Sequence, residues 1–405
     1  MIRRLFAVLL ALSLIAVACG STADTAAETV EEAVTDEADE GDAEEEEAME
    51  DEEEGDAEEE EAMEDEEEGE AEEAPAEFQD VTMLVVNNMA HLPAFVANEF
   101  GLWPDRGLNV DLQTLGSGAD IAAGLQSGQA EFGAVNAGTG VAPQRASGLL
   151  TKLIAPYNND ATNAQYVDWI HIVGRADSGI SADPADFAGQ TIGVTGGGTP
   201  RAYLTAFLGQ LGLTDDDIEV VVLGVGDMIP EILAGNVDAI VPFSPFHESA
   251  LRQLGDNGVI VSEGEPLVSS QIGLGAVDGQ LEADPDTFRA FIEGLVEAAY
   301  IVRTDQEAAA EVVLSFIEGI TLEDAIAALN NNTYDPRVSV CVEYGVAQTA
   351  ADLIESGAVE SDTPFTADDL IDASLLNEVL EANPQWIEDL PPLPETVEEC
   401  SGVGG

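Results

Sequence analysis

The chain has 405 residues and carries 82 aspartates and glutamates against 11 lysines and arginines, which gives a formal net charge of −71. This charge repels nucleic acid and anionic lipid, so it excludes proteins that bind either of them by charge attraction. Because salt screens self-repulsion beyond about 8 Å, such a surface suits a saline medium, and we predict a marine or halophilic source.

The chain begins with the order of a secretory leader. Residues 1–18 start with two arginines, continue as an apolar run too short for a comfortable membrane span, and end in small residues before Cys19. This arrangement resembles a bacterial lipobox, in which the cysteine becomes the lipidated N-terminus. A plain cleaved leader and an uncleaved anchor are the alternatives. We therefore predict a signal peptide over 1–18, lipidation at Cys19, and an extracytoplasmic body anchored to the outer face of the cell membrane.

The next segment is almost purely acidic. Residues 24–77 hold 32 acidic residues and no basic ones, and the unit DAEEEEAMEDEEEG occurs twice, at 42–55 and 56–69. Like charges repel, and too few apolar groups are present to offset the entropy of ordering. We predict a disordered acidic linker over 19–77, which serves either as a tether for the body or as a spacer without a partner.

From residue 78 onward, short β-rich runs alternate with helical ones. The first set predicts strands over Val81–Asn87, Leu108–Leu115, Glu131–Asn136 and Lys152–Pro156, with helices over Pro93–Phe100, Asp120–Ser127 and Val141–Gly148. The second set predicts strands over Thr191–Thr195, Glu219–Leu223 and Ala239–Pro242, with helices over Arg201–Leu211 and Met228–Leu233. Beyond about residue 284 we predict four amphipathic helices, over Thr287–Arg303, Gln306–Phe316, Leu322–Leu329 and Val338–Glu355. Two α/β sets closed by a helical tail predict two lobes with a cleft between them.

The segments after the predicted strands are rich in glycine, hydroxyl, amide and aromatic side chains and are nearly free of acids. Ligands of open parallel sheets bind at these positions. Gly197, Gly198 and Thr199 follow a strand and open a helix, where Thr199 suits the N-cap and free N–H groups attract an anion. Arg201 either binds a sulfonate or carboxylate, or faces solvent or a surface acid. The pattern predicts a neutral or anionic ligand.

Several separate motifs resemble the substrate-binding proteins of nitrate, sulfonate and taurine ABC importers, which share their fold with the pyrimidine-precursor binding proteins. These motifs are PAFVANEFGLWPDRGLNVDLQTLGSGADIAAGLQSGQAEFG (93–133), RADSGI (175–180), FAGQTIGVTGGGTPRAYL (187–204), LAGNVDAIVPFSPFHESAL (233–251) and DPRVS (335–339). The resemblance implies an α/β periplasmic-binding-protein fold of the second type with C-terminal helices. It also implies a first lobe over 80–174 plus 268–400, a second lobe over 175–265, and crossovers near 174–181 and 263–270.

The resemblance also implies ligand contacts. Ser117 and Gly118 form the turn before a helix of the first lobe, and Asn136 and Thr139 lie at the end of its third strand; capping roles are the alternative. His91 precedes the first helix, as a histidine does in the pyrimidine-precursor proteins, and either contacts ligand or caps that helix. In a related yeast enzyme this histidine is consumed as a substrate.

Aromatic side chains are candidates for the cleft walls. Phe243 and Phe246 follow the last strand of the second set, and His247, Tyr157 and Trp103 are further candidates, with a place in the core as the alternative. Aromatic walls would favour a heterocycle or an alkyl sulfonate over nitrate.

The chain has only three cysteines, Cys19, Cys341 and Cys400. The related enzyme has a cysteine-rich motif, so its absence here disfavours catalysis. In an oxidising compartment we expect Cys341 and Cys400 to form a disulfide that pins the C-terminal tail; two free thiols are the alternative. The sequence contains no metal motif, phosphate loop or catalytic triad, and we expect no cofactor.

We therefore predict a monomeric, tethered receptor, not an enzyme. It would capture a sulfonate-, taurine- or nitrate-like solute between its lobes and deliver it to the permease and ATPase of an ABC importer. The alternative is a binding protein for a pyrimidine or thiamine-precursor heterocycle. The rivals are an enzyme of pyrimidine synthesis and an acidic surface protein without a ligand.

Overall fold

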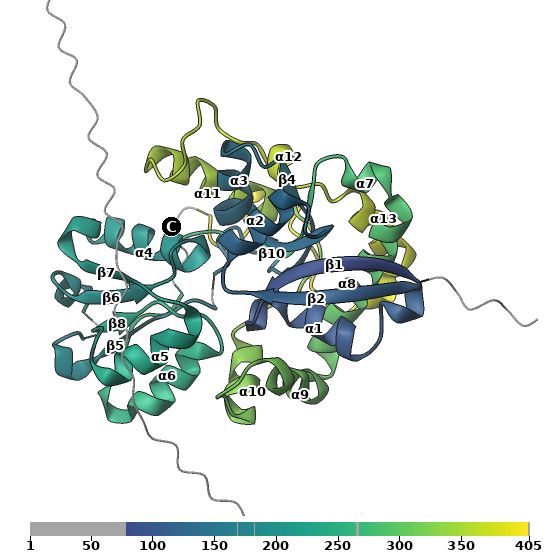
Figure 1. Cartoon of the computed structure of the whole chain (residues 1–405). Coiled ribbons are helices and arrows are strands. Elements are labelled where there is room, and N and C mark those ends of the chain that lie inside the picture. Colours follow the sequence, from purple (N-terminus) through teal and green to yellow (C-terminus); the bar gives the residue numbers. More distant parts are fainter. Residues whose placement is uncertain (1–77, 168, 182, 265–266, 404–405) are drawn as a thin grey trace, which may run out of the picture. The chain divides into compact units, whose positions relative to one another are not determined.

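The computed structural model describes residues 78–405 except 168, 182, 265–266 and 404–405 (Figure 1). The predicted signal peptide, Cys19 and the acidic linker fall outside the described residues. None of the helices in the described part is both long and apolar enough to cross a bilayer. The described part contains two five-stranded sheets, and we call the α/β units around them lobe 1 and lobe 2.

The sheet of lobe 1 has the strand order β2-β1-β3-β10-β4. Its strands are β1 (Gln79–Val86), β2 (Leu108–Leu115), β3 (Phe132–Asn136), β4 (Thr151–Asn158) and β10 (Ile272–Val277). Strand β1 runs parallel to β2 and β3, whereas β10 returns from lobe 2 and lies antiparallel between β3 and β4. The unbroken buried run in β3 and the nearly continuous one in β4 are typical of a sheet that is covered on both faces.

The sheet of lobe 2, coloured teal at the left of Figure 1, has the order β7-β6-β8-β5-β9. Its strands are β5 (Ile172–Arg175), β6 (Thr191–Val194), β7 (Glu219–Val222), β8 (Ala239–Ile240) and β9 (Gly258–Ser262). The chain enters lobe 2 between β4 and β5 and leaves it between β9 and β10. The entry lies earlier than the crossover expected near 174–181, because β5 already pairs antiparallel with β8 and β9.

Helices cover both sheets. Lobe 1 contains α1 (Leu92–Glu99), α2 (Gly118–Ser127) and α3 (Ala142–Ala146), with a π-helical turn η3 (Ala137–Val141) between β3 and α3. Lobe 2 contains α4 (Gly198–Gln210), α5 (Val225–Ala234) and α6 (Phe246–Leu254). The C-terminal part adds α7 (Gln280–Ala283), α8 (Pro285–Thr304), α9 (Gln306–Phe316), α10 (Leu322–Asn330), α11 (Val340–Glu355), α12 (Ala367–Leu370) and α13 (Ser374–Ala382). Side chains fix several helix starts: Ser117 caps α2, Asp284 caps α8, and Thr321 forms a capping box at α10.

The core of lobe 1 joins the sheet to the C-terminal helices through aromatic side chains. Trp103 and Phe132 both stack on Phe291 of α8, and the Trp103 indole N–H donates to the Phe291 carbonyl at 3.2 Å. Gly294 leaves room for the indole, since a Cβ at this position would lie 2.6 Å from Trp103. Trp103 is therefore a core residue, which was the alternative to its place in the cleft wall.

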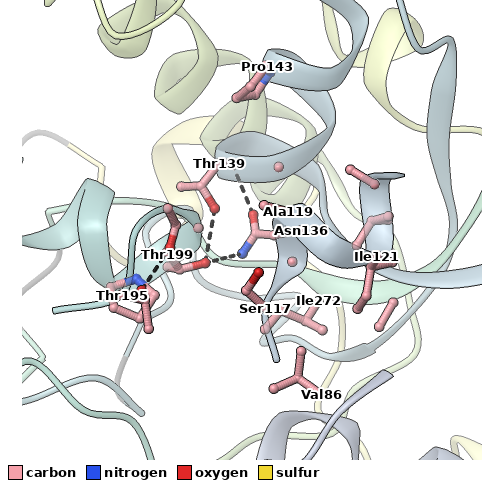
Figure 2. Close-up of a pocket in the computed structure, with 18 of the residues that line it drawn as sticks. Val86, Ser117, Ala119, Ile121, Asn136, Thr139, Pro143, Thr195, Thr199 and Ile272 are labelled. Atoms are coloured by element: carbon pink, nitrogen blue, oxygen red, sulfur yellow. Dashed lines mark hydrogen bonds between the residues drawn. The ribbon is translucent and has the colours of Figure 1, made fainter. Parts of the chain in front are cut away.

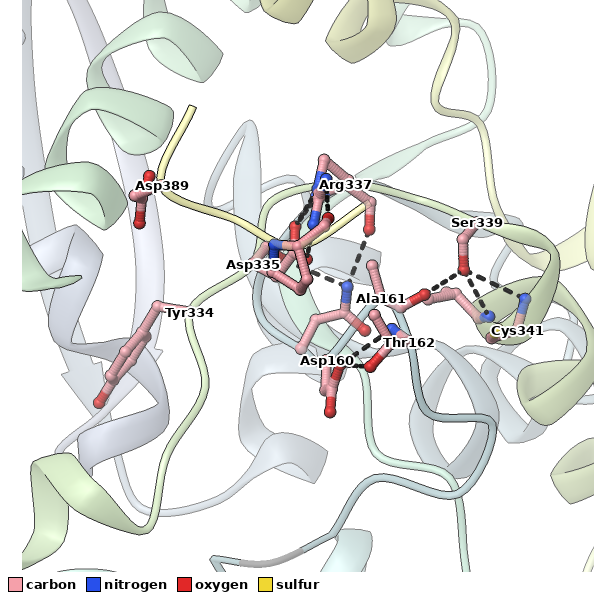
Figure 3. Close-up of polar contacts among 12 residues, drawn as sticks. Asp160, Ala161, Thr162, Tyr334, Asp335, Arg337, Ser339, Cys341 and Asp389 are labelled. Carbon is pink, nitrogen blue, oxygen red and sulfur yellow. Dashed lines mark hydrogen bonds and ion pairs between the residues drawn. The ribbon is translucent and has the colours of Figure 1, made fainter. Parts of the chain in front are cut away.

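The C-terminal segment holds the first connection between the lobes (Figure 3). The Asn159 side-chain amide donates to the carbonyls of Asp335, at 3.2 Å, and Arg337, at 2.9 Å. The Ser339 hydroxyl donates to the Ala161 carbonyl at 2.5 Å. The buried Asp335 carboxylate in turn accepts from Arg337 Nε at 2.9 Å and Nη2 at 2.7 Å. This ion pair fixes the turn on which the connection rests.

A disulfide ties the C-terminal tail to the same place. Cys341 and Cys400, which the sequence analysis expects to pair, are bonded with their Cα atoms 5.5 Å apart. Next to the disulfide, the Ser401 N–H donates to the Thr162 carbonyl and the Ser401 carbonyl accepts from the Ala164 N–H, both at 2.9 Å. The tail is therefore an integral part of the connection between the lobes.

Candidate functional site: a cavity between the lobes

A cavity of about 520 Å³ lies where the carboxyl ends of the strands of both lobes meet (Figure 2). Lobe 1 lines it with the end of β1, the first turns of α2, the end of β3, η3 and α3. Lobe 2 lines it with the segment after β6, the start of α4, and residues at the start of α5 and after β8. The cavity therefore occupies the position where ligands bind to open α/β sheets.

The two lobes touch directly in the cavity wall. Asn136, at the end of β3, donates Nδ2 to Thr199 Oγ1 of α4 at 3.1 Å, and Thr139 Oγ1 of η3 lies 3.0 Å from the same hydroxyl (Figure 2). All three side chains are buried. Two further hydrogen bonds fix the Asn136 side chain. Its Oδ1 accepts from the Thr139 N–H, and its Nδ2 also donates to Ser270 Oγ at 2.7 Å. This cluster is a polar latch, formed by Asn136, Thr139 and Thr199, that exists only when the lobes meet.

The N-termini of α2 and α4 line the cavity from opposite lobes. At α4, no side chain caps the first N–H groups and no acid stands in the first turn, while Gly198 has the positive φ of +76° that favours glycine. At α2, the Ser117 hydroxyl accepts from Asp120 N at 3.3 Å and donates to the Asp120 carboxylate at 2.8 Å. The α4 terminus is thus suited to a polar head group, whereas the α2 terminus is already capped by its own residues.

His91 lines the cavity as a neutral ring. Its Nδ1 lies 2.9 Å from the Tyr157 hydroxyl, and both side chains are buried. Burial lowers the pKa of His91 to about 3 and raises the pKa of Tyr157 far above its usual value. Both groups therefore carry no charge at neutral pH, and Tyr157, which does not itself line the cavity, positions the imidazole.

The remaining walls are largely apolar. Val86, Ile121 and Ile272 line the cavity from lobe 1 (Figure 2), and Trp169 and Phe243 line it from the connection and from lobe 2. These two aromatic rings form a T-shaped contact, with centroids 6.0 Å apart and an angle of 61° between the ring planes. Trp169 could not be predicted from the sequence, because a single tryptophan in a connection belongs to no periodic pattern.

Most of the predicted ligand residues line the cavity. These are His91, Ser117, Gly118, Asn136, Thr139, Gly197, Gly198, Thr199 and Phe243. Arg201 and Phe246 do not line it. The Arg201 guanidinium pairs with Asp215 instead, because one helical residue turns about 100° and positions 199 and 201 therefore point to different sides of α4. Phe246 packs on Phe243 from behind, with centroids 5.6 Å apart.

Away from the cavity, α6 of lobe 2 and α10 of lobe 1 form a second contact between the lobes. Arg252 binds both carboxylate oxygens of the buried Asp324 at 2.9–3.1 Å, and Asn331 donates to Glu248 Oε1 at 2.9 Å. Burial acts to raise the pKa of Asp324, but the hydrogen bonds from Arg252 and Thr321 outweigh it and lower the pKa. Across the described residues, no three or more His, Cys, Asp or Glu side chains are grouped to hold a metal ion.

The arrangement of sheets and helices is that of the two-lobed periplasmic binding proteins. The alkanesulfonate-binding protein SsuA from Xanthomonas axonopodis pv. citri, bound to MOPS, superposes with a TM-score of 0.62 at 17% identity, covering 74% of this chain and 99% of that one. The periplasmic nitrate-binding protein NrtA from Synechocystis PCC 6803 gives 0.61 at 14% identity, covering 79% and 92%. The desulfurization enzyme DSZB gives 0.53 at 17% identity, covering 75% and 99%. At these identities the likeness concerns the fold alone.

The sequence model of the NMT1/THI5-like family matches residues 88–309, more than half of the chain, and the protein belongs to this family. A Brucella abortus protein whose name describes it as a candidate binding protein is 28% identical over 148 residues. The match covers 36% of this chain and 41% of the Brucella protein, so less than half the length of that relative is spanned.

Proposed function

We propose that this protein is a solute-binding receptor of an ABC importer and works outside the cytoplasm. The observation that carries the proposal is the cavity of about 520 Å³, which both lobes line with the segments at their strand ends. Membership of the NMT1/THI5-like family and the periplasmic-binding-protein fold support the same function.

The size of the cavity favours an organic solute. Ligand pockets for small organic molecules are about 300–1,000 Å³, and this cavity falls inside that range, whereas nitrate would leave most of it unfilled. The sulfonate- and taurine-like solutes predicted from the sequence would place their head group at the uncapped start of α4. The aromatic rings of Trp169 and Phe243 favour the alternative, a heterocycle that stacks on them.

The receptor works by closing around its ligand. A solute that contacts α2 of lobe 1 and α4 of lobe 2 binds more tightly to the closed form, and this difference in affinity drives closure. The polar latch of Asn136, Thr139 and Thr199 then adds direct bonds between the lobes. The closed, monomeric receptor would dock on the permease and its ATPase, held near the membrane by lipid at Cys19.

We assign the site a binding role without catalysis. Cys341 and Cys400 are joined in a disulfide and neither lines the cavity, so they supply no nucleophile there. His91 is neutral and hydrogen-bonded to Tyr157, an arrangement that suits a fixed contact with a ligand.

Native mass spectrometry tests the proposal without knowledge of the ligand. The full chain is incubated with a cell metabolite extract, exchanged into ammonium acetate and examined for bound mass. We expect one discrete small-molecule increment on the wild type. It should be lost in Ala119→Trp, which fills the cavity from an exposed position on α2, and kept in Ala146→Trp, an exposed α3 residue outside the lining. No increment on the wild type, or an equal one on Ala119→Trp, would contradict a receptor that binds in this cavity.

A further inference from the structure

The cavity is uncharged although the protein is strongly acidic. Residues 78–405 contain 50 acidic residues against nine lysines and arginines. Among the described residues that line the cavity, none is an Asp, Glu, Lys or Arg, and His91 is held neutral by burial. The lining is therefore neutral within a body whose net negative charge repels anions.

The cations of the body are committed elsewhere. Each arginine in the described part forms an ion pair with at least one carboxylate; the set is Arg106, Arg145, Arg175, Arg201, Arg252, Arg289, Arg303 and Arg337. Lys152 lies in β4 and is not among the lining residues. An anion in the cavity would therefore meet no side-chain cation within the described lining.

Three hydroxyl groups of the cavity lining also donate to partners within the protein. Ser117 donates to the Asp120 carboxylate at 2.8 Å, Thr195 donates to the Gly197 carbonyl at 2.8 Å, and Ser147 donates to the Gln144 carbonyl at 2.7 Å. A carboxylate next to the α2 terminus also cancels part of the attraction that the helix dipole exerts on an anion. The α4 terminus offers uncapped N–H donors, and the buried indole N–H of Trp169 in the cavity wall has no hydrogen-bond partner in the described part of the chain. A neutral carbonyl or sulfonyl oxygen can accept from these donors.

Part of the cavity lies between α2 and α3 of lobe 1, and we call this part the groove. From α2 it is lined by the exposed small or flexible side chains of Ala119, Ala123 and Gln126, and from α3 and its C-cap by Pro143 and Ser147. Figure 2 shows Pro143 and Ala119 on the lobe 1 side, across from Thr195 and Thr199 of lobe 2. Neither side of this groove carries a charge, so an apolar part of a ligand fits it without desolvating an ion.

We propose that the ligand of this receptor is an uncharged organic solute, with a polar oxygen at the start of α4 and an apolar part in the groove between α2 and α3. The inference rests on the proposed function, and of the neutral or anionic ligands expected from the sequence it favours the neutral class. One reason is that Arg201, the candidate side-chain cation for an anionic ligand, is paired with Asp215 outside the cavity lining.

Isosteric pairs that differ only in charge test the proposal. Isothermal titration of the full chain compares hexane-1-sulfonamide with hexane-1-sulfonate, and benzamide with benzoate, in 0.15 M and in about 2 M NaCl. We expect the neutral member of each pair to bind at least tenfold more tightly at the lower salt, and the gap to narrow at high salt because screening weakens repulsion. A sulfonate or benzoate that binds as tightly as its neutral partner would overturn the inference and leave the receptor function standing. If none of the four compounds binds, the result would count against the uncharged ligand and against the receptor function.

Two variants locate the effect. Ala123→Leu fills the groove and should weaken hexane-1-sulfonamide at least fivefold more than ethane-1-sulfonamide, whereas Ala146→Leu, outside the lining, should change neither. Asp120→Asn removes the carboxylate beside α2 and should improve hexane-1-sulfonate severalfold with little effect on the sulfonamide. Its control is Glu311→Gln, which also removes one negative charge, at an exposed position on α9. Equal effects of Ala123→Leu and Ala146→Leu, or of Asp120→Asn and Glu311→Gln, would overturn the placement.

Discussion

Thr199→Val removes the hydroxyl at the centre of the polar latch while keeping the shape of the side chain. In the wild type this hydroxyl bonds to Asn136 Nδ2 at 3.1 Å and to Thr139 Oγ1 at 3.0 Å, and both partners belong to the other lobe. A hydrogen bond contributes a net of about 0.5–1.5 kcal/mol, so two bonds stabilise closure by about 1–3 kcal/mol. Because ligand is held by the closed form, affinity should fall about 5- to 150-fold.

The assay is isothermal titration with the solute recovered by native mass spectrometry. In parallel urea unfolding, the free energy of unfolding should fall by less than the binding free energy does, because the latch forms between the lobes and not within one lobe. Thr205→Val is the matched control, because Thr205 is an exposed threonine on the same helix whose hydroxyl donates only to the Arg201 carbonyl. An unchanged affinity for Thr199→Val, or an equal loss for Thr205→Val, would refute the latch.

Three further predictions concern groups around the site. The Cys341–Cys400 disulfide joins residues 59 positions apart and so lowers the entropy of the unfolded chain. Its reduction should lower the free energy of unfolding in urea by about 4 kcal/mol. A decrease below about 1 kcal/mol would contradict a stabilising role. Arg201→Ala breaks only a surface ion pair with Asp215, so ligand affinity should change less than twofold and stability by less than about 1 kcal/mol, and a large loss of affinity would return Arg201 to the site. The pKa of His91 is lowered from 6.5 in the unfolded chain to about 3 in the folded chain. Between these two values His91 is protonated in the unfolded chain and neutral in the folded one. Stability should therefore fall as the pH drops from 6.5 toward 3, by about 2 kcal/mol at pH 5, and His91→Gln should remove that part of the pH dependence.

The alternation of elements was readable from the sequence wherever runs were long and flanked by turn residues. The predicted strand Leu108–Leu115 is β2, and the predicted helix Gln306–Phe316 is α9. Strands β5, β9 and β10 were not predicted, because their pairing is antiparallel to neighbours that are distant in the chain. Ile172–Arg175 has only four residues, and nothing local in them indicates which sheet they join.

The candidate site was predictable to the extent that it depends on strand ends. Parallel strands bring their carboxyl ends to one edge, so Asn136, Thr199 and Gly118 could be grouped without coordinates. The orientation of single side chains was not predictable. Arg201 is two residues beyond Thr199 on a helix and pairs with Asp215, which follows the rest of α4 and the loop after it. The burial that neutralises His91 likewise arises from packing between distant segments.

The most direct test of the proposed receptor function is the distance between the two lobes. Spin labels on Gln210→Cys at the end of α4 and Gln348→Cys on α11, both exposed and both outside the cavity lining, report that distance by double electron–electron resonance. With the solute recovered from the extract, the account predicts a shift from a longer or broader distribution to one short, narrow distance, and no such shift in Ala119→Trp. A distance distribution that is the same with and without bound solute would contradict a receptor that closes around its ligand.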